Sequence, residues 1–265
     1  MNTKLLYIDY SLLHEDFSKL VNEHFYNLLN HYKEPDTIVN VASLPCQGKT
    51  KSITLPKIPY YYDDLFKLID DSKNTYDGVM LGCSSDPGIR EAQILKSLPI
   101  FAPLKSALHN GGLLGRKIAI ICPANNGNRK RPLSWHEDSV ASYNFRREFV
   151  RFYLTDVEPI EQVIIDNKIK KKEWRNLLDL VLEKYSQSIR DGGMKQAKKA
   201  VSEGAEVVYF ACTIWSGMLK PISDALEVPV IDPVISMLKT SEMVLKSKKL
   251  SEKAYFRKNY QQNIA

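Results

Sequence analysis

The chain has 265 residues, of which 44% are hydrophobic and 26% charged, and its formal net charge at pH 7 is +6. These proportions exclude a disordered or collagen-like chain. No apolar run approaches the ~18–20 residues of a membrane-spanning helix, and acidic residues interrupt the N-terminal stretch where a secretion signal needs apolar sequence. We therefore expect a soluble, cytoplasmic protein with one large domain or two medium-sized domains.

Short apolar runs typical of strands alternate with helical patterns along the whole chain. The pattern predicts strands over 4–9, 37–42, 78–82, 100–102, 117–122, 207–211 and 230–231. It predicts helices over 15–32, 63–73, 91–98 and 172–202, and an amphipathic or frayed helix in the basic run 246–258. Alternation of this kind favours parallel sheets covered by helices. The last helix is expected to pack on the first domain or on a neighbouring subunit of a homo-oligomer.

The excess positive charge is spread over several separate clusters, at 129–131, 146–147, 168–172 and 246–249. Proteins that bind nucleic acids carry basic stripes with interleaved aromatic residues, whereas lysines on solvated helix faces explain these clusters more simply. We expect neither a nucleic acid nor a membrane as a partner. The five histidines form no pair at the spacing of metal ligands, so no metal site is predicted.

The chain contains an internal repeat centred on two cysteines. Residues 76–83 align with 205–212, and after a slip of one residue 99–103 align with 229–233. The repeat predicts two similar α/β domains related by a pseudo-two-fold axis, with an active-site cleft between them. The first domain would comprise residues 1–115 and about 236–265, and the second would comprise residues 116–235.

Each half of the repeat places a cysteine at the end of a strand, where ligands bind in open parallel sheets. Cys83 and Cys212 occupy these positions. Asp86 and Pro87 follow the first thiol in the order typical of a helix N-cap and first helical residue. A helix N-terminus stabilises a thiolate, so the pattern predicts thiol pKa values lowered from ~8.5 toward neutrality. The unmatched Cys46 and Cys122 are interpreted as structural.

Two thiols that face each other can invert a stereocentre. One thiolate removes the proton from one face of a carbon, and the opposing thiol delivers a proton to the other face. The competing interpretation is that both cysteines are small apolar residues of the core. That interpretation is the usual one for a single cysteine, but two cysteines at matched positions of a repeat favour the paired acid and base.

Two segments resemble the cysteine motifs of the aspartate/glutamate/hydantoin racemase superfamily, and they are most similar to its hydantoin racemase branch: DGVMLGCSSDPGIREAQILKSLPIFAPLKSALH (77–109) and GAEVVYFACTIWSGMLKPISDALEVPVIDPV (204–234). The resemblance implies flavodoxin-like domains and a racemase or epimerase that uses no cofactor. The reacting carbon would lie next to a carboxylate or amide carbonyl of an amino acid or hydantoin-like derivative. Catalysis is assigned to Cys83 and Cys212, and substrate binding to Ser84, Ser85 and Thr213.

The sequence departs from this family after the first strand. The family has an Asn-Pro-Asn-Ser/Thr loop there, whereas this chain has Asp9, Tyr10 and Ser11. Asp9 would repel a carboxylate but can accept hydrogen bonds from an amine or a ring N–H, so we assign Asp9 and Ser11 to substrate binding. Arg129 or Arg131 is a candidate anion contact, and the competing interpretation is a solvated basic loop.

Two other functions stay open at this point. One thiolate of the pair can add to an unsaturated diacid and allow its cis–trans isomerisation. A homologue that only binds a small molecule is the second alternative, and the Asp9 departure favours it. Each alternative takes a small molecule with a carboxylate or carbonyl as its partner.

Overall fold

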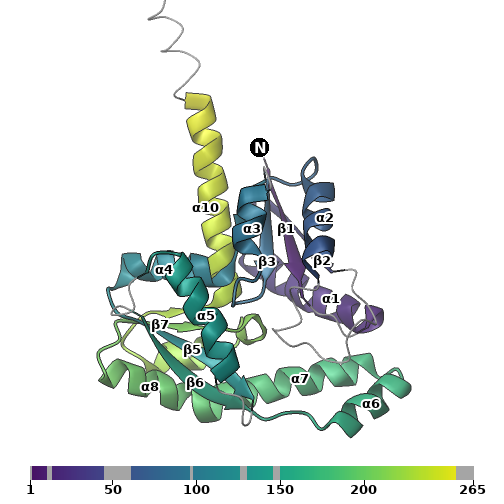
Figure 1. Cartoon of the computed structure of the whole chain (residues 1–265), viewed down its shortest axis with the longest axis vertical. Helices are drawn as coiled ribbons and strands as arrows, with labels where there is room; N and C mark the ends of the chain where they lie inside the picture. The colour runs from purple at the N-terminus through teal and green to yellow at the C-terminus, as the bar shows by residue number, and fades with distance from the viewer. Residues whose placement is uncertain are drawn as a thin grey trace, which may run out of the picture.

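Two parallel four-stranded sheets form the frame of the molecule (Figure 1). Their strand orders are β2-β1-β3-β4 and β6-β5-β7-β8, so the second sheet repeats the arrangement of the first. This confirms the predicted α/β class with two similar halves. The computed structural model describes residues 2–10, 14–44, 61–95, 98–125, 130–145 and 150–254, and only the backbone of 125, 130–134 and 250–254.

Apolar runs of the N-terminal half build the first sheet. Its strands are β1 (Thr3–Asp9), β2 (Thr37–Ser43), β3 (Gly78–Gly82) and β4 (Ile100–Phe101). All five residues of β3 are buried, as expected for a parallel strand that is covered on both faces. The helices that join these strands are α1 (Glu15–Tyr32), α2 (Tyr62–Ser72) and α3 (Ile89–Leu95).

The second sheet uses the same topology with two longer strands. Its strands are β5 (Ile118–Asn125), β6 (Val150–Val157), β7 (Val207–Phe210) and β8 (Val230–Ile231). The helices of this half are α5 (Lys130–Ser142), α6 (Gln162–Lys170), α7 (Trp174–Ser188), α8 (Met194–Ser202) and α9 (Lys220–Ala225). A π-helical stretch, Ile189–Gly193, joins α7 to α8, which makes the long helix predicted here nearly continuous.

Several elements of this half were not predicted, among them β6, α5 and α6. Strand β6 carries charged residues among its apolar ones, which masks its alternation. Helix α5 begins with a basic run and has Pro132 in its first turn, so the segment resembles a loop. Proline is tolerated there because the first N–H groups of a helix have no partner within it.

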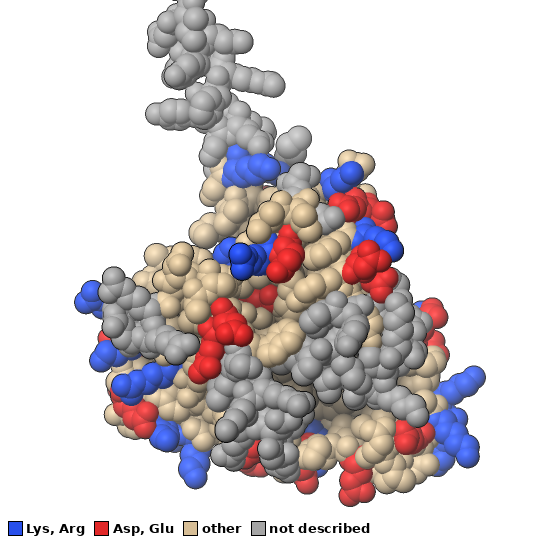
Figure 2. Space-filling view, in the orientation of Figure 1, with Lys and Arg blue, Asp and Glu red and all other residues tan. Residues whose placement is uncertain are grey.

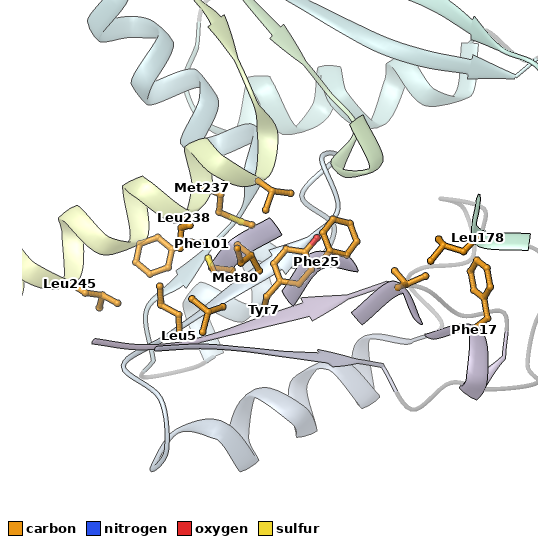
Figure 3. Close-up of a cluster of buried hydrophobic side chains, with 14 of the residues drawn as sticks. Leu5, Tyr7, Phe17, Phe25, Met80, Phe101, Leu178, Met237, Leu238 and Leu245 are labelled. Atoms are coloured by element: carbon orange, nitrogen blue, oxygen red, sulfur yellow. The ribbon is translucent and has the colours of Figure 1, made fainter. Parts of the chain in front are cut away.

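Helices α4 (Pro103–Leu114) and α10 (Pro233–Ala254) cross to the opposite half. Three buried residues of α4 pack in the core of the second sheet, namely Leu104, Ala107 and Leu108. Four buried residues of α10 pack in the core of the first sheet, namely Val234, Met237, Leu238 and Leu245. The last three are labelled in Figure 3. Each sheet is therefore covered in part by a helix that follows the last strand of the other sheet.

The two crossing helices also contact each other. Asn110 of α4 donates hydrogen bonds of 2.9 Å to both Ser236 and Thr240 of α10. Farther along α10, Lys249 lies 3.0 Å from Asp77, so the C-terminal helix packs along the first half. The domain limits of 1–115 with about 236–265, and 116–235, stay a prediction, because α4 and α10 contribute to both halves.

A second connection runs along the opposite side of the molecule, where α7 returns to pack against α1. Trp174 stacks on His14 with ring centroids 4.3 Å apart, and Arg175 lies 2.8 Å from Glu23. Leu177 joins the apolar cluster of the first sheet. The halves are thus held together at α4 and α10 and again at α1 and α7.

Charged side chains of both signs are mixed on the face shown in Figure 2. Among the residues that the structure describes, no helix has the length and apolar character needed to cross a membrane. Many lysines face a carboxylate one helical turn away, as Lys19 faces Glu15 at 3.0 Å. Pairs of this kind are typical of solvated helix faces.

The packing of α10 predicts the effect of a core truncation. Leu238 is fully buried in the first-sheet core, so Leu238→Ala is expected to lower the free energy of unfolding by about 2–5 kcal/mol. Val244 on the same helix is 41% exposed, and Val244→Ala should change it by less than about 0.5 kcal/mol. Urea unfolding of both variants would test this, and equal losses would contradict the placement of α10.

Candidate active site

The two cysteines of the repeat lie at equivalent places in the two sheets. Cys83 directly follows β3, and Cys212 lies two residues after β7 ends at Phe210. In both sheets the strand order reverses beside this strand, between β1 and β3 and between β5 and β7. This switch point at the carboxyl ends of the strands is where parallel α/β sheets bind ligands.

A hydrogen bond joins the two cysteine loops directly. The Thr213 hydroxyl, next to Cys212, donates to the carbonyl oxygen of Gly82, next to Cys83, over 3.2 Å. Because consecutive Cα atoms are ~3.8 Å apart, the Cα atoms of the two cysteines are separated by at most roughly 12 Å. A negative charge on Cys83 raises the pKa of Cys212. The structure therefore brings the loops of the two predicted thiols together.

Hydroxyl groups surround the first thiol. The Cys83 sulfur lies 3.3 Å from the Ser85 hydroxyl. The side chains of Ser84 and Ser85 are almost fully buried. Asp9, 5% exposed, is in register with Gly82 and so ends beside the same loop. Sequence analysis assigned all three polar side chains to the site, and the fold places them around Cys83.

The second thiol is held by a short 3₁₀ turn, Thr213–Trp215. Backbone N–H groups of Ile214 and Trp215 face the sulfur and lower the pKa of Cys212. The Trp215 indole is fully buried and donates to the Ser188 hydroxyl over 3.1 Å. This anchors the turn on the helical layer of the second half.

The carboxylate of Asp86 connects the first cysteine loop to helix α4. It accepts the backbone N–H groups of Leu104 at 2.9 Å and Lys105 at 2.7 Å. These are the N–H groups that an N-cap side chain normally satisfies, and the N-cap residue Ala102 offers no side-chain acceptor. Asp86 was predicted to cap the helix that follows it; this is wrong, because α3 begins only at Ile89 and Asp86 caps α4 instead.

A second carboxylate, which is partly buried, makes the equivalent connection in the other half. Asp232 precedes α10 and accepts the N–H groups of Val234 and Ile235 at 3.1 and 3.0 Å. It also accepts hydrogen bonds of 2.7 Å from the Ser216 hydroxyl and the Gly217 N–H in the loop after Cys212. This role was not predicted from the sequence, although the order Asp232-Pro233 is itself an N-cap signal.

Helix α5 of the second half covers the first cysteine loop. The Ser139 hydroxyl donates to the carbonyl oxygen of Ser85 over 3.0 Å, and the Tyr143 hydroxyl donates to Asp86 over 2.7 Å. The candidate residues Ser11 and Arg129 lie outside the described residues, as does the side chain of Arg131. Their predicted roles, and the cleft between the halves, stay predictions.

Comparisons with known proteins match this architecture. The family model described as Asp/Glu/Hydantoin racemase matches residues 54–240 and includes both cysteine loops. The chain belongs to this racemase family. It is 22% identical over 176 residues to a hydantoin racemase of Paenarthrobacter aurescens, a match that covers 66% of this chain and spans 64% of the length of that protein.

Solved racemase structures share the fold. The allantoin racemase from Klebsiella pneumoniae superposes with a TM-score of 0.67 at 15% identity, covering 93% of this chain and 89% of the other. The allantoin racemase from Pseudomonas fluorescens gives 0.64 at 15% identity, with 93% and 92% covered. A glutamate racemase from Francisella tularensis gives 0.50 at 13% identity, with 94% and 82% covered.

In this member of the racemase family, burial controls the acidity of the two thiols. Burial raises the pKa of Cys83 although hydrogen bonds from Ser85 lower it. Burial also raises the pKa of Cys212, to about 12. The predicted lowering of both pKa values is wrong. Helix α3 begins six residues after Cys83, at Ile89, and the field of a helix end falls off within its first turn.

These pKa directions predict how the thiols react with iodoacetamide. A raised pKa leaves little thiolate at pH 7, so alkylation of Cys83 and Cys212 should accelerate about tenfold per pH unit up to at least pH 9. Peptide mass spectrometry at a series of pH values would follow each thiol separately. If the alkylation rate of either thiol stopped rising near pH 7.5, this would contradict the conclusion that burial dominates the pKa of that thiol.

Proposed function

We propose that this chain is a cofactor-independent racemase or epimerase in which Cys83 and Cys212 are the acid–base pair for a 1,1-proton transfer. The observation that carries the proposal is the Thr213–Gly82 hydrogen bond, which joins the loops of two cysteines at matched positions of a repeat. Family membership supports the reaction class, and the thiols supply the chemistry without a metal ion or other cofactor.

In the proposed reaction, one thiolate removes the proton from the carbon next to a carbonyl group. The electron pair left behind moves into the carbonyl, which gives an enolate, and the opposite thiol protonates the carbon on its other face. One proton is taken up and one is released, so the two sulfurs exchange roles in each turnover. The hydroxyls of Ser84 and Ser85, together with loop N–H groups that include that of Thr213, are suited to bind the oxygen that becomes negative. The Thr213 hydroxyl itself already donates to Gly82.

The coupling between the thiols supports this division of roles. Because a charge on Cys83 raises the pKa of Cys212, the first deprotonation makes the second one harder. The pair is therefore stable over a range of pH with one thiolate and one thiol. That is the form the reaction requires, since it needs one base and one acid at the same time.

Asp9 supports a neutral substrate that carries N–H groups. Its charge raises the pKa of Cys83 and of Tyr10, so it acts on the space beside the first thiol. A second negative charge there would be repelled, whereas a ring or amide N–H can donate to it. We therefore propose a hydantoin-like substrate over an acidic amino acid.

The two-thiol reaction predicts the behaviour of single serine variants. Cys83→Ser and Cys212→Ser should each slow racemisation of 5-benzylhydantoin by about 10²–10⁴-fold, because serine is a far weaker base than a thiolate. Proton NMR in D₂O should show that each variant still exchanges the C5 proton of one enantiomer. The favoured enantiomer should differ between the two variants.

The matched control is Cys122→Ser, because Cys122 is fully buried in the second-sheet core and takes no part in the reaction. It should racemise the probe at a rate close to that of the parent. If both site variants racemise like the parent, the two-thiol reaction is wrong. If the parent binds the probe without exchanging its proton, the chain is a binding protein.

The role of Asp9 predicts a change in ligand preference. Asp9→Asn removes the negative charge, so the KM for 5-benzylhydantoin should rise about tenfold through loss of a charge-assisted hydrogen bond. Inhibition by N-carbamoylphenylalanine, the ring-opened carboxylate of the same compound, should become stronger. Competitive inhibition assays on both proteins would measure this, and weaker inhibition in the variant would contradict the proposed substrate class.

A further inference from the structure

We propose that Asp86 and Asp232 are positioning residues, each of which holds one thiol of the pair by fastening its loop to the N-terminus of a crossing helix. The inference rests on the proposed function for its catalytic meaning. The prediction that each carboxylate holds the loop of one cysteine and not that of the other can be tested without a substrate.

The first fastening joins Cys83 to α4. Asp86 lies three residues after the thiol with a φ of 52°, a left-handed conformation that costs energy in residues other than glycine, although aspartate tolerates it better than most. Its two carboxylate oxygens accept N–H groups 18 and 19 residues away in the sequence. A loop strained in this way holds its shape because the charged hydrogen bonds fix it.

The second fastening joins Cys212 to α10 with the direction reversed. Here the carboxylate belongs to the helix and reaches back to the loop, where Ser216 and Gly217 donate to it. Ser216 closes the network because its hydroxyl oxygen also accepts the N–H of Val234 over 3.0 Å. Asp232 is thus an ordinary N-cap of α10 with two additional bonds that hold the cysteine loop.

The parallel construction is the reason to assign a common role. In both halves a carboxylate accepts the second and third N–H groups of the helix that crosses to the other half. In both halves the same carboxylate holds the loop that carries the cysteine. Asp86 belongs to the cysteine loop, whereas Asp232 belongs to the start of the crossing helix. The similarity between the two connections therefore does not come from residues that align in the repeat. The shared feature is the connection itself.

The two connections differ in their surroundings. Tyr143 donates to Asp86 from just after α5, so the first connection also involves the second half. Asp86 interacts electrostatically with five titratable groups, namely Lys105, Tyr143, Cys83, Tyr10 and Tyr209. Burial raises the pKa of Asp86 to about 6 despite three donors, so measurements should be made above pH 7.5, where it is ionised.

Alkylation of individual thiols at pH 8.5 tests the inference. Asp86→Asn replaces an accepting oxygen by a donating amide group, which frees the loop and exposes Cys83. Alkylation of Cys83 by iodoacetamide should accelerate roughly fivefold, the equilibrium factor of about one hydrogen bond, while Cys212 keeps its parental rate. Asp232→Asn should accelerate Cys212 alone. Isotope-coded iodoacetamide and peptide mass spectrometry give both rates from one sample.

Two further variants separate positioning from general destabilisation. Asp77→Asn is the matched control, because Asp77 also accepts a backbone N–H, from Lys4 at 2.7 Å, but lies at the opposite end of β3. It should change neither rate. Tyr143→Phe removes a single donor from Asp86 and leaves the α4 cap intact, so it should accelerate Cys83 by a smaller factor even if Asp86→Asn does not fold.

The outcomes are distinct from those of the racemisation assays. The Asp86 charge raises the pKa of Cys83, so Asp86→Asn alone would accelerate Cys83 even without movement of the loop. Selective acceleration of Cys83 by Tyr143→Phe as well as by Asp86→Asn, and of Cys212 by Asp232→Asn, supports the inference whether or not the chain racemises hydantoins. Equal acceleration of both thiols, no change at either, or a slower Cys83 in Asp86→Asn and Tyr143→Phe would overturn it. If the inference and the proposed function both hold, Asp86→Asn should lower kcat for 5-benzylhydantoin with little change in KM.

Discussion

The constraint on which the site depends is that each cysteine loop is tied to a helix whose apolar face lies in the other half. Asp86 ties the first loop to α4, which packs in the second core, and Asp232 ties the second loop to α10, which packs in the first core. Neither core can form fully without bringing the opposite loop into place. The burial energy of residues far from the thiols, such as Leu238, is thereby coupled to the separation between the sulfurs.

The acidity of the thiols follows from the same construction. The loops are held tightly against the sheets, so the sulfurs are partly buried and their pKa values are raised. Burial of a single thiol disfavours its ionised form, the thiolate. The paired arrangement changes the consequence, because the proposed reaction needs only one thiolate at a time. Mutual repulsion between the sulfurs then opposes the doubly ionised form, which has no acid to complete the transfer.

The sequence predicted every strand except β6 and the place of each cysteine, since apolar runs and a matched repeat are local signals. It did not predict the contacts that build the site. Thr213 and Gly82 are 131 residues apart. Asp86 directly precedes Pro87, as an N-cap residue of the next helix would, so its bonds to α4 could not be seen in the sequence. Helix α4 shows an apolar face that would suit either sheet, so its crossing could not be read from periodicity. The thiol pKa values depended on the burial produced by these contacts, and the prediction from helix position alone had the wrong sign.

The two thiols have unequal surroundings although the repeat makes them equivalent in position. Enantiomers have equal free energy, so kcat/KM must be the same in both directions of a racemisation, whatever those surroundings are. The unequal surroundings instead influence which of the two thiols is ionised. Asp9 raises the pKa of Cys83, and in the proposed complex a substrate N–H bound to Asp9 would offset part of its negative charge. A substrate of the proposed class would therefore favour the Cys83 thiolate on binding, whereas a carboxylate would oppose it. Selection for N–H groups and activation of the first thiol would then come from the same interaction.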